Sequence, residues 1–199
     1  MSVICGIATS TALYLGADDM VRVGQMRLTG VRKLHVVPSL TANCCPTWVV
    51  GVAGDMRALG ELSMISRLEC PDIHSFMRNV RLHVSDLKPA RVEDPYGFEM
   101  LVGCAPVAGS DEPCRLWVVS NTLAFTEVSV GSVGAVGSGA QAALGAAHAL
   151  KHADIDGYVA SPSEVLRLSM RAASQVNAFC GSDYCGLRLA SGKAPESLW

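Results

Sequence analysis

Short apolar runs rich in β-branched residues, separated by turn residues, dominate the first quarter of the chain. Two of these runs, at about 2–9 and 12–17, predict a pair of strands near the N-terminus. Two more, at 33–37 and 47–54, flank the turn-rich segment PSLTANCCP and predict a second pair. The chain is therefore expected to begin with strands.

Helical spacing replaces this pattern after residue 54. One helix is predicted to begin at Asp55 and to end at Pro71, because proline cannot continue a helix. A second helix is predicted over 72–87, where apolar residues recur along one face at helical intervals. That face is formed by Ile73, Phe76, Met77, Val80, Val84 and Leu87.

The pattern then returns to strands, which are predicted at about 98–104, 115–120 and 122–129. A short strand leads into the sharp turn GSG at 137–139. The alanine-rich run behind this turn predicts a helix that packs closely against its neighbours.

The last predicted helix has a clear N-terminal signal. Ser161 is placed as its cap, Pro162 as its first residue and Glu164 as the partner that completes a capping box. A closing strand is predicted over 184–190. This order of elements predicts an α+β fold formed by one domain, 1–199, with two antiparallel sheets packed face to face and helices outside, a four-layer αββα sandwich.

Composition indicates a well-packed protein that binds neither nucleic acid nor membranes. Apolar residues make up 50% of the 199 residues and charged residues only 17%, which separates the chain from disordered proteins. A net charge of −2 and 6% aromatic residues provide neither a basic field nor a stacking surface for nucleic acid. Low charge with high apolar content also suggests that part of the surface is buried against other chains.

The sequence predicts a soluble protein. No stretch of 18 or more residues has the apolar character of a membrane span, and Asp18 and Asp19 interrupt the opening run before any signal cleavage site. The eight cysteines show no zinc spacing and mostly lie in apolar runs, as expected of small buried residues in a reducing cytoplasm. The five histidines show no metal-ligand spacing, so no metal site is predicted.

Several motifs in order resemble a proteasome β-type subunit, in the bacterial HslV-like branch of the N-terminal nucleophile hydrolases. They are a hydroxyl residue at position 2, LGAD ending at residue 18, GVRKL at 30–34, VVGVAGD at 49–55 and AVGSGAQAALGAAHAL at 135–150. Each motif alone is weak, but their order and spacing together are specific. The resemblance spans nearly the whole chain.

The resemblance implies that Ser2 is the nucleophile. Removal of Met1 would expose an α-amine that titrates at about pH 7.7–8.0 beside the Ser2 hydroxyl, so that one residue supplies both nucleophile and base. A small residue in second position is also common without any catalytic reason.

By the same resemblance, Lys33 is the active-site lysine and Asp18 holds its charge in place. A buried ammonium near Ser2 would favour the alkoxide and keep the amine neutral. Arg32 and Asp19 compete for these two roles on sequence alone, and either expected residue is also ordinary at a strand end or turn.

The strand at 47–54 is expected to form the substrate side of the site. Gly51 matches the glycine whose N–H faces the oxyanion, since glycine inside a strand suggests close backbone approach. Val49 and Ala53 share its face by strand alternation. The resemblance implies that these two small apolar residues line the pocket for the residue before the cut.

Ser138 matches the serine that supports the terminal amine, although serine between two glycines is also a common turn. The segment NAFCG departs from the family pattern, because Asn177 stands where an aspartate is usual and Cys180 where serine or threonine is usual. Asn177 cannot carry charge and Cys180 is a weak hydrogen-bonding substitute. Support for the amine is therefore reduced.

Three functions are compatible with these residues. The first is a peptidase that assembles as a homo-oligomeric ring around its active sites, receives unfolded polypeptide from an ATPase partner and needs no metal or organic cofactor, as the resemblance implies. The second is a catalytically inactive subunit with a structural or assembly role in a ring or shell. The third is a small-molecule amidase.

Overall fold

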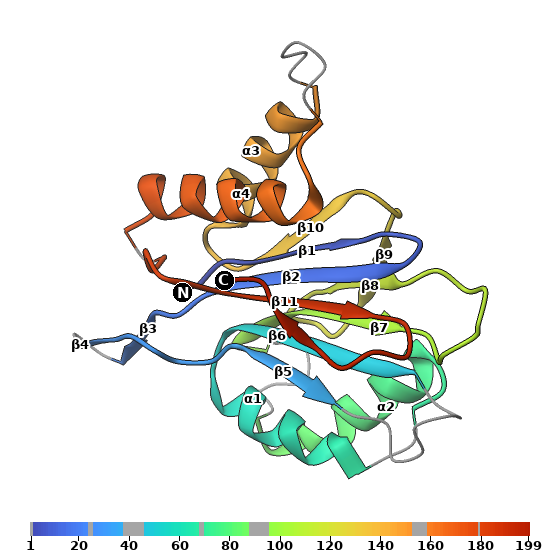
Figure 1. Ribbon diagram of the computed structural model, residues 1–199. Helices are drawn as coiled ribbons and strands as arrows, with labels where there is room; N and C mark the ends of the chain where they lie inside the picture. Colours follow the sequence, from blue (N-terminus) through green and yellow to red (C-terminus); the bar gives the residue numbers. More distant parts are fainter. Residues whose placement is uncertain are drawn as a thin grey trace.

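The computed structural model describes residues 2–23, 26–37, 46–67, 70–87, 96–152, 159–178 and 180–199. Figure 1 shows four layers: helices α3 and α4, a sheet built around β1 and β2, a second sheet built around β6 and β7, and helices α1 and α2. This is the α+β, four-layer αββα arrangement that the order of elements predicts.

The first sheet contains both ends of the chain. It has five antiparallel strands in the order β10-β1-β2-β11-β12. Its central strands are the two predicted near the N-terminus, joined by a tight turn, so position 2 lies at one end of this sheet. The strands are β1 (Ile4–Ala8), β2 (Ala12–Asp18), β10 (Val133–Val136), β11 (Tyr184–Ala190) and β12 (Glu196–Ser197).

The second sheet is a five-stranded antiparallel meander in the order β5-β6-β7-β8-β9. Its strands are β5 (Leu34–Val37), β6 (Thr47–Gly54), β7 (Phe98–Ala105), β8 (Arg115–Val119) and β9 (Phe125–Val128). A separate two-stranded hairpin, β3 (Val21–Val23) and β4 (Met26–Leu28), was not expected from the sequence. The long loop expected between the second pair of strands lies mostly outside the described residues.

The helices begin where the sequence predicts but are shorter. The first is only α1 (Arg57–Leu62), followed by a 3₁₀ segment, Ser63–Arg67, and the second is α2 (Ile73–His83), followed by the 3₁₀ turn Ser85–Leu87. The helices α3 (Ala140–His152) and α4 (Pro162–Val176) cover the other sheet.

The predicted cap of α4 is confirmed. The Ser161 side chain accepts a hydrogen bond from the Glu164 N–H, and the Glu164 carboxylate accepts one from the Ser161 N–H. These reciprocal bonds satisfy backbone donors that a helix N-terminus leaves open.

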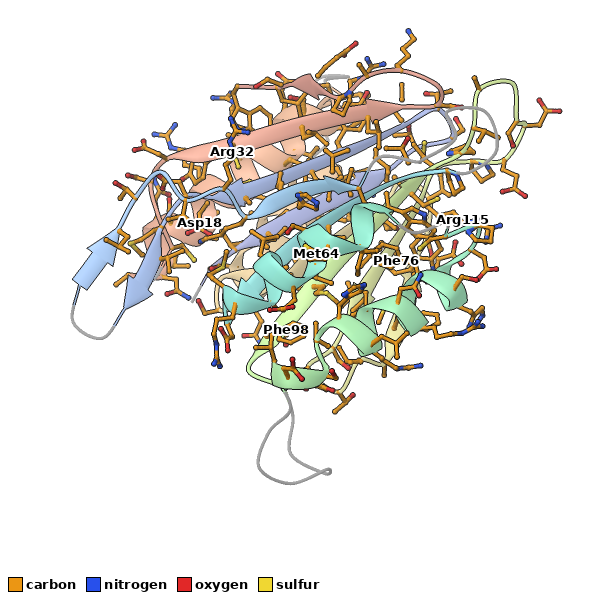
Figure 2. All side chains as sticks on the ribbon, turned by 90° about the horizontal axis from the view of Figure 1, so that it is seen from below. Asp18, Arg32, Met64, Phe76, Phe98 and Arg115 are labelled. Atoms are coloured by element: carbon orange, nitrogen blue, oxygen red, sulfur yellow. The ribbon has the colours of Figure 1, made fainter. Side chains whose placement is uncertain are left out.

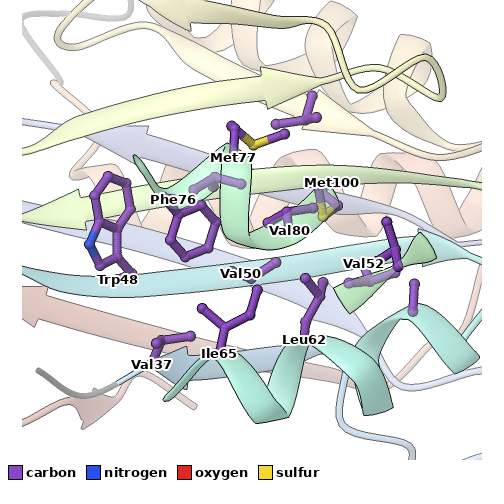
Figure 3. Close-up of a cluster of buried hydrophobic side chains, with 14 of the residues drawn as sticks. Val37, Trp48, Val50, Val52, Leu62, Ile65, Phe76, Met77, Val80 and Met100 are labelled. Carbon is purple, nitrogen blue, oxygen red and sulfur yellow. The ribbon is translucent and has the colours of Figure 1, made fainter. Parts of the chain in front are cut away.

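Three buried apolar clusters hold the four layers together. Trp48 stacks on Phe76 with ring centroids 4.6 Å apart, and this pair lies in the cluster between the second sheet and the helices α1 and α2 (Figure 3). The second cluster lies between the two sheets and the third between the first sheet and α3 and α4. Met64 is 53% exposed on the 3₁₀ segment after α1, in the helical layer drawn in Figure 2.

The described cysteines are largely buried. Cys5, Cys70, Cys114 and Cys180 are buried, and Cys104 and Cys185 are half-buried. Burial raises the pKa of the Cys104 thiol to about 12 and of the Cys114 thiol to about 11. These cysteines therefore behave as small apolar residues, as expected, while Cys44 and Cys45 lie outside the described residues.

None of the helices in the described ranges is long and apolar enough to cross a membrane. Within the same ranges, no group of three or more histidine, cysteine, aspartate or glutamate side chains is placed to hold a metal ion.

Candidate active site

Ser2 lies directly before β1 and is almost completely buried, with 2% of its surface exposed. The turn Gly137–Gly139 wraps around its carbonyl group, because the Gly139 N–H donates to the Ser2 carbonyl oxygen at 3.3 Å. Gly137 has a φ of +92°, and a Cβ added there would lie 2.2 Å from the same oxygen. Only glycine fits this approach, so the contact with Ser2 requires glycine at position 137.

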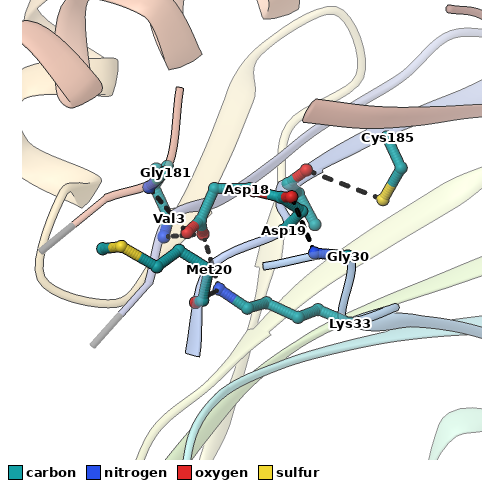
Figure 4. A network of polar contacts seen from close by, with 9 residues as sticks. Val3, Asp18, Asp19, Met20, Gly30, Lys33, Gly181 and Cys185 are labelled. Atoms are coloured by element: carbon teal, nitrogen blue, oxygen red, sulfur yellow. Dashed lines mark hydrogen bonds and ion pairs between the residues drawn. The ribbon is translucent and has the colours of Figure 1, made fainter. Parts of the chain in front are cut away.

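Asp18 and Lys33 form a buried ion pair beside Val3, the residue that follows Ser2 (Figure 4). The Lys33 Nζ lies 2.9 Å from Asp18 Oδ1, and both side chains are fully buried. The same carboxylate oxygen accepts the Val3 N–H at 2.7 Å. The ammonium therefore lies beside the peptide group that joins Ser2 to Val3.

Further hydrogen bonds fix this pair in place. Asp18 Oδ2 accepts the Gly181 N–H at 3.0 Å, and Lys33 Nζ also donates to the Met20 carbonyl oxygen. A buried ion pair is tolerated when its remaining donors and acceptors are satisfied in this way. Asp18, at the end of β2, and Lys33, directly before β5, therefore meet in one polar cluster.

The two residues that compete with Lys33 and Asp18 in the sequence, Arg32 and Asp19, lie outside this buried pair. Arg32 is exposed, and Asp19 accepts the Gly30 N–H at 2.8 Å in a turn. Burial lowers the pKa of Lys33, and the neighbouring Asp18 carboxylate opposes that shift. A poorly solvated ammonium is a strong source of positive field for a neighbouring hydroxyl, because little water screens it.

Gly51 does not lie where the sequence analysis expected. It sits in the interior of β6, paired with Leu34 on one side and Leu101 on the other. A Cβ added to it would lie 2.6 Å from Ile4 Cγ2. Close packing of the two sheets therefore explains why residue 51 is a glycine. This placement in the strand interior argues against Gly51 as an oxyanion donor.

Gly54, at the end of β6, takes the place expected for Gly51. Its φ is +105°, and it lines a pocket of about 460 Å³ together with Ser2. The Val52 N–H donates to the Lys33 carbonyl oxygen, and alternate residues of a strand direct their N–H groups to the same side. The Gly54 N–H therefore points toward the side of Lys33 and away from β7.

Only one of the two expected pocket residues reaches Ser2. Val49 and Ala53 share one buried face of β6, as strand alternation predicts, within the cluster between the sheets. Ala53 lines the pocket that contains Ser2, whereas Val49 is buried between the sheets and is absent from the pocket wall.

Ser138, Asn177 and Cys180 come together next to the same pocket. Ser138 lines it, and its carbonyl oxygen accepts a hydrogen bond from Asn177 Nδ2 at 2.7 Å. The Cys180 thiol forms a hydrogen bond with the Ser138 side chain, which partly opposes the rise in the thiol pKa that burial causes. The residues that depart from the family pattern thus remain in contact with the turn that wraps Ser2.

Glu99 was missed in the sequence, where it follows a phenylalanine inside an ordinary strand pattern. It lies on β7 in the wall of the Ser2 pocket, and its Oε2 accepts the Gly137 N–H at 3.0 Å. A charged residue amid the apolar run FEMLVGCA was the available signal.

No protein-family model matches the sequence, and a comparison with curated proteins gives no match. Solved structures do match. Anbu, an ancestral beta-subunit from Yersinia bercovieri, has a TM-score of 0.74 at 15% identity, over 98% of this chain and 86% of that chain. HslV from Trypanosoma brucei has a TM-score of 0.62 at 19% identity, over 94% of this chain and 99% of that chain.

BPH from Thiobacillus denitrificans has a TM-score of 0.70 at 15% identity, over 94% of this chain and 97% of that chain. A second structure of BPH is a complex with epoxomicin. Likeness at such low identity establishes shape and leaves activity open. Together with the four layers and the position of Ser2, these neighbours show that the chain has the proteasome-like N-terminal nucleophile hydrolase fold.

Proposed function

We propose that this protein is a peptidase in which Ser2 is the nucleophile after removal of Met1. The observation that carries this proposal is the buried Lys33–Asp18 pair, which is held beside the Ser2–Val3 peptide. Ser2 itself lines a pocket. A buried charge pair is an expensive arrangement that a purely structural role does not need at this position.

The reaction is an acyl transfer. The α-amine of Ser2 takes the hydroxyl proton, directly or through water, while Oγ bonds to the substrate carbonyl carbon. The Lys33 ammonium stabilises the developing alkoxide, and the Gly54 N–H, in place of Gly51, donates to the oxyanion. The C–N bond then breaks and the leaving amine takes the proton from the Ser2 ammonium. In the second step the Ser2 α-amine takes a proton from water, whose oxygen bonds to the acyl carbon of the ester. The bond from this carbon to Oγ breaks, Oγ takes the proton back from the α-ammonium, and the carboxylic acid product leaves.

The remaining residues have supporting roles in this proposal. Ser138 hydrogen-bonds the α-amine, Asn177 and Cys180 position Ser138, and Ala53 provides an apolar wall for substrate, with Val49 packed behind it. The contacts of Asn177 and Cys180 with Ser138 support this assignment.

Two measurements on natively produced protein test the proposal. Its intact mass is expected to lack one methionine, because the amine exists only after that cleavage. The processed protein is then expected to react with epoxomicin, the molecule held by the BPH complex, and to carry the added mass on its N-terminal peptide. Retention of Met1, or a processed protein that stays unmodified and cleaves no unfolded polypeptide, would contradict the proposal.

A non-catalytic subunit is the second candidate, and one observation favours it. Neither Asn177 nor Cys180 supplies the negative charge that the family pattern places near the terminal amine, so the amine is less well supported. This candidate gains support if the processed protein fails both measurements while remaining folded.

We further propose that the protein assembles as a homo-oligomeric ring served by an ATPase partner. Its low charge and high apolar content support burial of surface against other copies. Light scattering at micromolar concentration is expected to give a mass several times 20.9 kDa. A monomer under these conditions would count against the ring.

A further inference from the structure

The pocket beside Ser2 contains an isolated acidic group. Among the described residues that line it, Glu99 alone carries a charge, and the others include Ala53, Gly54, Tyr96 and Asn121. The nearby Asp55 carboxylate already forms an ion pair with Arg57, whose Nη2 lies 2.6 Å from Asp55 Oδ2. Glu99 is therefore the one negatively charged side chain among the described residues of this pocket wall.

In space, a single residue, Gly137, lies between Glu99 and the proposed nucleophile Ser2. Its Oε2 accepts the Gly137 N–H at 3.0 Å, and Gly137 packs directly against the Ser2 carbonyl oxygen. A group that reaches Glu99 through this pocket therefore belongs to a substrate residue that flanks the bond under attack.

Of the two Glu99 carboxylate oxygens, only Oε2 accepts a hydrogen bond from a described residue. Within the described ranges, the hydrogen bond from Gly137 is its one partner, and none of the four ion pairs found there includes Glu99. A half-buried carboxylate with a free oxygen binds a cation more strongly than a neutral donor, because Coulomb attraction between opposite charges adds to the hydrogen bond and water screens it less than at the surface.

We propose that this pocket binds a cationic group, the guanidinium or ammonium of an arginine or lysine side chain next to the scissile bond. The preference for arginine or lysine next to the scissile bond rests on the proposed peptidase function, but the binding of a cation in this pocket does not. An acidic substrate residue would be repelled by Glu99, and a neutral hydrogen-bond donor would bind the free Glu99 oxygen more weakly than a cation does.

Binding to the processed Ser2→Ala protein tests the inference without any turnover. NMR titration compares N-acetyl-arginine amide with N-acetyl-citrulline amide, which has the same shape but no charge. We expect about tenfold tighter binding of the arginine compound, because only its side chain carries a positive charge that the Glu99 carboxylate attracts at short range. Alanine amide, whose only cation is its α-ammonium, separates side-chain recognition from recognition of a free N-terminus and is expected to bind no better than the citrulline compound.

Glu99→Gln is the matched variant, because the glutamine carbonyl still accepts the Gly137 N–H while the charge is lost. It is expected to bring the ratio of the two affinities close to one. Glu127→Gln, on the exposed strand β9, removes the same charge away from the pocket and is expected to keep the tenfold ratio.

Equal binding of the arginine and citrulline compounds to the Ser2→Ala protein, or an unchanged ratio in Glu99→Gln, would overturn the inference. Tighter binding of alanine amide would assign the pocket to an N-terminal ammonium and overturn the side-chain assignment. Because no bond is cleaved in these titrations, an inactive protein can still confirm the cation site while the peptidase proposal fails.

Discussion

Replacing Ser2 with alanine is expected to abolish peptide hydrolysis by the processed protein, whereas Ser2→Thr retains it. Both variants keep a small second residue, so Met1 is still removed and the α-amine is still exposed. Alanine lacks the Oγ that forms the acyl-enzyme, while threonine keeps a hydroxyl on the same carbon. The measurement is the rate of cleavage of an unfolded polypeptide or a short fluorogenic peptide, with intact mass confirming the processing.

The control is Ser10→Ala, the same substitution at an exposed position in the turn between β1 and β2. It is expected to leave the rate unchanged. Cleavage by the Ser2→Ala protein at a rate close to wild type would remove Ser2 from the mechanism and indicate a nucleophile elsewhere.

Lys33→Met is expected to reduce both activity and stability. Loss of the ammonium removes charge stabilisation comparable to an oxyanion donor, worth about 3 kcal/mol or roughly a hundredfold in kcat. It also leaves the fully buried Asp18 without its counter-charge, which is expected to lower the free energy of unfolding by about 3–5 kcal/mol. Denaturant titration and initial rates measure the two effects separately.

The double variant Lys33→Met with Asp18→Asn separates the two roles of the pair. It leaves no buried charge, so part of the lost stability is expected to return, while activity stays low because the ammonium is still absent. Arg57→Met breaks the exposed pair with Asp55 and is expected to leave the free energy of unfolding nearly unchanged. Full activity in Lys33→Met would show that the ion pair serves folding alone.

Local patterns predicted most elements of the fold because burial on one face imposes a period on the sequence. The strands at 47–54 and 184–190 have the predicted bounds, and the capping box of Ser161 and Glu164 forms as expected. The hairpin of β3 and β4 was missed because its strands have three residues each, too short for a recognisable period. The first helix turns into a 3₁₀ segment, a change that apolar spacing does not specify.

Sequence motifs likewise pointed to Ser2, Asp18 and Lys33 as candidates, because each stands at the beginning or end of an apolar run and matches the family pattern. The structure pairs Asp18 with Lys33 in the interior, whereas Asp19 accepts the Gly30 N–H and Arg32 is exposed.

The apolar run that forms β6 and the succession of strands and helices along the chain follow from the sequence itself, because burial and turn chemistry act over a few residues at a time. Which glycine of β6 lies beside Ser2 was decided only by the packing of the two sheets, which places Ile4 against Gly51 and leaves Gly54 at the pocket. The same packing brings Glu99 of β7 to Gly137, a contact between residues 38 positions apart. Such contacts depend on the distance between elements in space, and no local period in the sequence encodes that distance.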